Sequence, residues 1–244
     1  MIVFLHGVPE TSALWDRVRD EFDDETVALA LPGFGCARPE RFGATKDDYA
    51  NWLVTELERF DAPVDLVGHD WGALLTVRIA TTRADLLRSW TADSANGVHP
   101  DAEWHRYARV WQTPGEGEAY FQAIHETPIE NIAEAYESFH LNHGDALTLA
   151  GWSDDTMGTC ILDLYRSATP NVFASWGAEL GPTSAPGLIL LAELDSFGNE
   201  AMSQDVAKTL GTREATLSGV GHWWALESPH ESAEVIKEFI RSID

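Results

Sequence analysis

The residues with the clearest chemical meaning form the pentapeptide Gly68-His69-Asp70-Trp71-Gly72. It follows the apolar run 64–67 and precedes the apolar segment 73–80, so a buried strand, a tight turn and a buried helix are expected in succession. Glycines on both sides of the turn let the backbone bend tightly and push the central side chain outward, above the start of the helix. The pattern predicts a nucleophile elbow with Asp70 at its tip, and His69 beside it is expected to pack structurally.

An aspartate at the tip of the elbow favours one class of reaction. A carboxylate that attacks a saturated carbon forms an ester, which an activated water molecule can hydrolyse. A serine at the same place would leave an ether that the site could not cleave. The sequence therefore predicts displacement at a saturated carbon, as in an epoxide or an alkyl halide.

Hydrolysis of that ester needs a base, and His222 in a glycine-rich segment before the last predicted helix is the candidate. Its acid partner is expected between nucleophile and histidine in the chain. Asp195 follows a predicted strand, at the strand end where active sites of open α/β sheets lie. We favour Asp195, with Glu193 just before it and Asp93 at the end of the strand after the elbow as alternatives.

Two backbone N–H groups are expected to bind the oxyanion that forms as the ester is hydrolysed. One belongs to Trp71, directly after the nucleophile. The other is expected from Val8, in the loop 6–10 that follows the first predicted strand, where Pro9, in cis or trans, fixes the turn. His6 is expected to brace this loop through backbone hydrogen bonds, and not to act as a base.

Four motifs in this order give the chain a resemblance to the α/β-hydrolase superfamily, in the branch of epoxide hydrolases and haloalkane dehalogenases. They are His-Gly-x-Pro at 6–9, Leu-Pro-Gly-Phe-Gly at 31–35, the Asp70 pentapeptide, and Gly-x-Gly-His-Trp at 219–223. The family usually has two strands before the His-Gly strand, whereas this chain begins at that strand. The resemblance therefore implies about six strands, and a sheet edge that must be covered in another way.

The lid separates the two branches of that family. Epoxide hydrolases hold the epoxide oxygen with two lid tyrosines, and a phenol with a pKa of about 10 suits this role. Tyr107 stands four residues before the stretch Trp-Gln-Thr-Pro-Gly at 111–115, and Tyr165 precedes Arg166, as in that family. The resemblance implies that Tyr107 and Tyr165 are catalytic and that the chain is a cofactor-independent epoxide hydrolase.

Two alternatives remain open. A haloalkane dehalogenase would bind the halide through N–H donors, for which Trp71 is one candidate; a lid tryptophan would be the other, among Trp104, Trp111, Trp152 and Trp176. A non-catalytic small-molecule-binding protein on the same scaffold is the second alternative.

The elements that must position these residues follow an alternating pattern. Apolar runs typical of buried strands lie at 2–5, 26–31, 64–67, 88–92, 188–192 and 214–217. Helical patterns lie between or after them, at 12–22, 47–60, 73–82, 129–141, 154–168, 199–210 and 229–240. This alternation predicts an α/β fold with a mainly parallel sheet. Because residues 98–184 lack a strand pattern, we expect them to form a helical cap inserted into a core of residues 1–97 and 185–244.

The composition of the chain excludes some classes of binding partner. The net charge of −24 over 244 residues argues against binding to nucleic acid or to anionic membranes. The sequence has no membrane-spanning apolar stretch and no signal peptide pattern, so a cytoplasmic monomer or homodimer is expected. Trp71, Trp111 and Trp223 are expected to line a pocket for a small apolar or aromatic epoxide.

No cofactor or metal is expected. His140 and His143 have a spacing that could bind a metal after Glu137, but no further ligand set follows, and a solvated helix face is the preferred interpretation. Cys36 and Cys160 are expected to be buried thiols without a disulfide.

Overall fold

The computed structural model describes residues 1–243, and its centre is a six-stranded sheet in the order β2-β1-β3-β4-β5-β6. All neighbouring strands are parallel. The strands are β1 (Ile2–Leu5), β2 (Thr26–Leu29), β3 (Val64–Gly68), β4 (Leu87–Ala92), β5 (Gly187–Ala192) and β6 (Arg213–Leu217). The direction in which strands are added reverses between β1 and β3, and open α/β sheets bind ligands at such a point.

The strand predictions are confirmed, with small shifts at the ends. The largest shift is at β2, which ends at Leu29 instead of residue 31. The reason is local, because the Leu31 N–H donates to His6 Nε2 at 3.1 Å and not to a neighbouring strand. The side chain of His6, from the loop after β1, thus bonds the chain directly after β2 and ends that strand.

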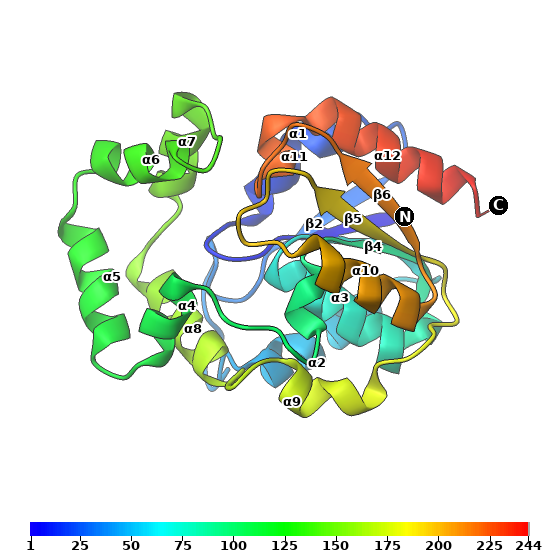
Figure 1. Ribbon diagram of the computed structural model, residues 1–244, viewed down its shortest axis with the longest axis horizontal. Coiled ribbons are helices and arrows are strands. Elements are labelled where there is room, and N and C mark those ends of the chain that lie inside the picture. Colours follow the sequence, from blue (N-terminus) through cyan, green and yellow to red (C-terminus); the bar gives the residue numbers. More distant parts are fainter. Residues whose placement is uncertain (244) are drawn as a thin grey trace.

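Helices cover both faces of the sheet (Figure 1). One apolar cluster lies between the sheet and α2, α3 and α10, and a second lies between the sheet and α1, α11 and α12. These helices are α1 (Asp16–Arg19), α2 (Lys46–Leu57), α3 (Trp71–Thr82), α10 (Glu200–Leu210), α11 (Trp224–Glu227) and α12 (Pro229–Arg241). Three short 3₁₀ turns join core elements: η1 (Ser12–Trp15), η2 (Ala84–Leu86) and η3 (Ala95–Val98).

The helix predicted at 12–22 is shorter in the structure and consists of η1 followed by α1. The N–H of Phe22 bonds the carbonyl of Arg19, and that of Glu21 bonds Val18. These contacts to the third preceding residue are tight turns, so the α-helix does not continue. The predicted apolar side is nevertheless buried, through Leu14, Trp15 and Val18.

Residues 98–184, which we call the cap, contain helices and no strand. They are α4 (Arg106–Gln112), α5 (Glu116–Glu126), α6 (Ile129–Glu137), α7 (His143–Gly151), α8 (Asp155–Arg166), α9 (Phe173–Trp176) and the turn η4 (Gly177–Glu179). Figure 1 shows α4 to α8 gathered to one side of the sheet, while α9 lies near α2. Side chains of α4 and α8 belong to one core cluster and those of α6 and α7 to the other, so the cap packs against both.

The cap helices predicted at 129–141 and 154–168 appear as α6 and α8. The first ends early because His140 has a φ of 79°, in the left-handed region, and Asn142 then caps α7. The sequence patterns had not singled out α4, α5 and α7.

The edge strands of the sheet are β2 and β6, and the four residues of β2 are all partly buried. Arg19 covers part of β2 by donating to both the hydroxyl and the carbonyl of Thr26. Both cysteines are free thiols, as predicted, but Cys36 is exposed and only Cys160 is buried, because Cys36 lies in the surface loop after β2. Among residues 1–243, none of the helices has both the length and the apolar character needed to cross a membrane.

Candidate active site

Asp70 occupies the turn between β3 and α3 with φ 52° and ψ −118°. A Cβ at Gly68 would lie 2.3 Å from the Gly72 carbonyl oxygen, and one at Gly72 would lie 2.3 Å from the carbonyl oxygen of Leu5. Both positions therefore require glycine, since real Cβ atoms do not approach backbone so closely. The turn places the Asp70 carboxylate above the first turn of α3.

The loop after β1 meets this carboxylate directly. Val8 N–H donates to Asp70 Oδ1 at 2.8 Å, and the backbone of Trp71 also hydrogen-bonds the side chain. The Val8–Pro9 peptide is cis. The two N–H groups expected to bind an oxyanion are thus both at the Asp70 carboxyl group.

His6 braces this loop, as predicted. Its Nδ1 donates to the Gly7 carbonyl at 2.9 Å, and its Nε2 accepts the Leu31 N–H. Its burial lowers its pKa to about 4, so this imidazole is neutral, and the hydrogen bonds fix the tautomer.

His222 lies between two carboxylates, those of Asp195 and Asp70. Its Nδ1 donates to Asp195 Oδ2 at 3.0 Å, while its Nε2 is 3.9 Å from Asp70 Oδ2. The N–H of Phe197 donates to the other oxygen of Asp195 at 2.8 Å and orients that carboxylate. The structure therefore brings together the three residues that the sequence singled out as nucleophile, acid and base.

The two alternative acids lie elsewhere. Glu193 accepts the N–H of Gly219 at 2.8 Å near the surface. Asp93 is buried and bonds His69, as described below, and neither carboxylate touches His222.

Burial and neighbouring charges set the pKa values of Asp70 and His222. Burial raises the pKa of Asp70 to about 6, although the charge of His222 opposes this rise. For His222, burial disfavours the charged form, but the attraction and hydrogen bond of Asp195 prevail and raise its pKa to about 8. Near pH 7 the free site therefore favours an Asp70 carboxylate facing a His222 imidazolium.

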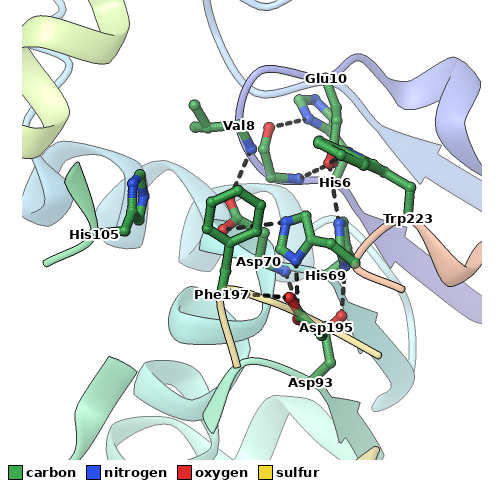
Figure 2. A network of polar contacts seen from close by, with 12 residues as sticks. His6, Val8, Glu10, His69, Asp70, Asp93, His105, Asp195, Phe197 and Trp223 are labelled. Carbon is green, nitrogen blue, oxygen red and sulfur yellow. Dashed lines mark hydrogen bonds and ion pairs between the residues drawn. The ribbon is translucent and has the colours of Figure 1, made fainter. Parts of the chain in front are cut away.

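A second imidazole, that of His69, is fully buried with its ring centroid 4.7 Å from that of His222, and it lies between Glu10 and Asp93 (Figure 2). His69 donates from Nδ1 to Asp93 Oδ2 at 2.5 Å and from Nε2 to Glu10 Oε1 at 3.0 Å. Burial opposes its charge, yet the two carboxylates hold the pKa of His69 well above its usual value. His69 is structural, as expected, and it acts as the cation of a buried ion network, which the sequence did not indicate.

Both carboxylates of this network are fully hydrogen-bonded. Asp93 also accepts from the Trp224 indole N–H at 2.5 Å and from the Asp70 N–H at 2.8 Å. Glu10 also accepts from the Trp223 indole N–H and the Gly7 N–H, both at 2.8 Å. The sequence analysis had not singled out Glu10, and its signal was an acidic residue directly after the Gly-x-Pro turn.

Three buried groups have the spacing of metal ligands, namely Glu10, His69 and His222. His69 is held as an imidazolium with both nitrogens donating, and a protonated nitrogen does not bind a metal. On the cap surface His143 pairs with Glu137 at 2.6 Å, and His140 is not part of that pair.

A cavity of about 210 Å³ lies between Asp70 and the cap. Trp111 and Trp223 line it, as the sequence predicted, whereas Trp71 lines a smaller neighbouring cavity of about 70 Å³. Residues that the sequence analysis did not single out supply most of the remaining wall of the larger cavity: His105, Tyr120, Phe121, Tyr136, Phe139 and Phe197. The larger cavity is therefore mainly aromatic.

The two predicted tyrosines line the larger cavity but differ in their surroundings. Tyr165 is buried, with its ring edge-on to Trp71 and Trp111 at 5.4 and 4.9 Å. Burial, together with the charge of Asp70, raises the pKa of Tyr165 well above its usual value, so it stays a donor. Tyr107 is partly exposed, and its hydroxyl oxygen accepts from Arg106 Nη2 at 2.5 Å.

The helix that carries Tyr165 is fixed to both the cap and the core. Gln112 on α4 donates to the Tyr165 carbonyl at 3.0 Å. Asp163 pairs with Arg38 of the core at 2.7 Å, and Ser167 accepts the Lys46 N–H at 2.8 Å. These contacts hold the Tyr165 hydroxyl over the elbow.

The chain is similar to known proteins in sequence and in fold. A model of the alpha/beta hydrolase family matches residues 2–235. Epoxide hydrolase 3 of Xenopus tropicalis is 24% identical over an alignment of 269 positions, which covers 99% of this chain and 71% of that protein. Haloalkane dehalogenase 2 of Mycobacterium tuberculosis is 26% identical over 223 residues, which cover 88% of this chain and 68% of that protein. The structure of a mutant of potato epoxide hydrolase superposes with a TM-score of 0.78 at 20% identity, covering 99% of this chain and 92% of that one.

Proposed function

Since the chain belongs to the alpha/beta hydrolase family and is a hydrolase, we propose that it converts an epoxide to a vicinal diol through an ester on Asp70. The observation that carries the proposal is a carboxylate at the tip of the elbow, 3.9 Å from the His222 imidazole and in one cavity with the Tyr165 hydroxyl. A carboxylate nucleophile serves at a saturated carbon, and a phenol serves where an alkoxide develops.

In the first step Asp70 attacks the less hindered epoxide carbon through Oδ2, the oxygen that does not bond Val8. The carbon–oxygen bond of the ring breaks, and Tyr165 donates to the developing alkoxide. Tyr107 can donate as well, because Arg106 offers only donors and leaves the phenol hydrogen free. The alkoxide takes the phenol proton, the phenolate regains a proton from solvent, and the product is a hydroxyalkyl ester of Asp70.

In the second step His222 takes a proton from water, and the resulting hydroxide attacks the ester carbonyl carbon. The N–H groups of Val8 and Trp71 hold the oxyanion, and Asp195 orients the base. The intermediate then collapses: the bond between the carbonyl carbon and the alkyl oxygen breaks, His222 returns its proton to that oxygen, and the diol leaves as the Asp70 carboxylate re-forms. The Asp70 charge helps to raise the pKa of His222, and esterification removes that charge. His222 thus becomes easier to deprotonate in the step that needs it as a neutral base.

Dehalogenation is the second candidate, and one observation favours it. The indole N–H groups of Trp71 and Trp111 are buried and have no hydrogen-bond acceptor among residues 1–243. Both could face a departing halide. The indole of Trp104 is not free for this role, since it donates to the Ala168 carbonyl at 3.0 Å.

A small substrate panel separates these activities. We expect diol from styrene oxide and no bromide from 1-bromobutane. Tyr165→Phe should slow ester formation from the epoxide by roughly ten- to a thousandfold, in line with general acid catalysis, while circular dichroism stays unchanged. Bromide release by both wild type and Tyr165→Phe, without epoxide turnover, would identify a dehalogenase. Ligand-induced stabilisation with no turnover of either compound would identify a non-catalytic binding protein.

A further inference from the structure

His105 projects into the site although no step above uses it. It precedes α4 and is partly buried, with its ring edge-on to Phe197 at 5.1 Å and to Trp111 at 5.7 Å. Figure 2 shows it on the side of Asp70 away from His69. It lines both the large and the small cavity, together with Asp70, Tyr165 and Phe197. His105 therefore stands where the two cavities meet.

The hydrogen bonds of His105 define which nitrogen faces substrate. Nδ1 accepts the Ala108 N–H at 3.2 Å and caps α4, so this nitrogen carries no hydrogen. Burial above all lowers the pKa of His105 to about 4, so the ring is neutral and its hydrogen is on Nε2. No group of residues 1–243 hydrogen-bonds Nε2. One N–H donor is thus left for a ligand.

The surroundings indicate the kind of acceptor. Trp71, which also lines the small cavity, offers a second buried N–H without a partner in residues 1–243. The carboxylate of Asp70 lines both cavities and would repel an anion, whereas the charge of Asp195 is paired with His222. Two neutral donors beside the Asp70 charge fit an uncharged oxygen.

The two cavities differ in size, so each suits a different substituent of the ligand. The small cavity, of about 70 Å³, suits a group of a few atoms, whereas the larger one, of about 210 Å³ with its aromatic wall, suits a ring or an alkyl chain. We propose that His105 selects epoxides that carry a short neutral oxygen substituent, such as hydroxymethyl, beside the ring, with the apolar substituent in the large cavity. This inference rests on the proposed epoxide hydrolysis.

Two epoxides that differ by one oxygen test it: trans-3-phenylglycidol and trans-β-methylstyrene oxide. We expect the wild type to prefer the alcohol in kcat/KM. His105→Phe, which removes the donor and the cap, should reduce this preference by roughly tenfold or more, because a buried hydrogen bond to substrate is lost. His105→Ser keeps a side chain that can cap α4 but has no donor reaching the cavity, and should reduce it equally.

The methyl compound is the internal control: a change in its kcat/KM reports a disturbed cavity wall or a disturbed α4, and only the ratio of the two kcat/KM values reports the lost hydrogen bond. A preference that survives both substitutions overturns the inference, and so does an equal loss for the two epoxides, which would assign His105 to the ring oxygen. If the wild type turns over neither epoxide, it is the proposed function that fails. Turnover of both with an unchanged ratio in the variants refutes only the role of His105.

Discussion

The molecule contains two carboxylate–imidazole–carboxylate groups that share their chemistry and differ in their contacts. His222 lies between Asp195 and Asp70, with nitrogen–oxygen distances of 3.0 and 3.9 Å. His69 lies between Asp93 and Glu10, at 2.5 and 3.0 Å. We call the group around His222 the upper group and the group around His69 the lower group. The longer distance to Asp70 is beyond a hydrogen bond, so the upper group keeps one open position. Residue type alone therefore does not distinguish a reactive group from a structural one.

The difference lies in how completely the carboxylates are bonded. Asp93 and Glu10 each accept three hydrogen bonds, from His69, from an indole and from a backbone N–H. Such a network, once fully satisfied, is rigid. Asp70 instead presents an oxygen to the cavity, and its side chain is 19% exposed. We therefore expect the lower group to hold geometry and the upper one to exchange protons and bonds.

The two groups meet at Asp70, the proposed nucleophile. Glu10 bonds the N–H of Gly7, whose neighbour Val8 donates to Asp70. Asp93 accepts the N–H of Asp70 itself. The buried network thus positions both the loop and the elbow against which the reaction takes place.

The largest effect is expected in the upper group. Asp195→Asn should leave the fold intact but slow ester hydrolysis by about ten-thousandfold, because the amide favours the wrong tautomer of His222. Rapid-quench measurement of ester breakdown would report it. Loss of less than tenfold would remove Asp195 from the role of acid.

The corresponding change in the lower group should act on stability. Asp93→Asn leaves the buried His69 cation without one of its two anions, and removing one partner of a buried pair costs about 3–5 kcal/mol in free energy of unfolding. Urea denaturation measures this cost, with the surface change Glu193→Gln as the matched control. We expect most activity to remain in the folded fraction. If Asp93→Asn lost ester hydrolysis but kept its full free energy of unfolding, Asp93 and not Asp195 would be the acid that orients His222.

The smallest effect is expected from pH. Burial raises the pKa of Asp70 to about 6, so its nucleophilic, deprotonated form prevails above that pH and is lost below it. The rate of ester formation in single turnovers should fall by about tenfold for each pH unit below 6. Circular dichroism over the same range controls for unfolding. A constant rate from pH 8 to 4.5 would contradict the assigned ionisation.

Sequence patterns predict local features of this molecule well and tertiary contacts poorly. The elbow could be predicted because strand, glycines and helix are contiguous, and Asp195 and His222 because they follow strands. Asp93 follows a strand equally well, so only the folded sheet shows which histidine it bonds. His105 could not be identified because its place depends on how α4 closes over the core. No periodic pattern encodes that closure.

The central claim is that Asp70 becomes esterified and that His222 is needed only to release the ester. His222→Gln should therefore form the ester and fail to hydrolyse it. After addition of trans-β-methylstyrene oxide, the intact mass of this variant should rise by the mass of one substrate molecule, and Asp70→Asn in the same background should abolish the increase. An unchanged mass in His222→Gln, with substrate binding demonstrated separately, would contradict the claim.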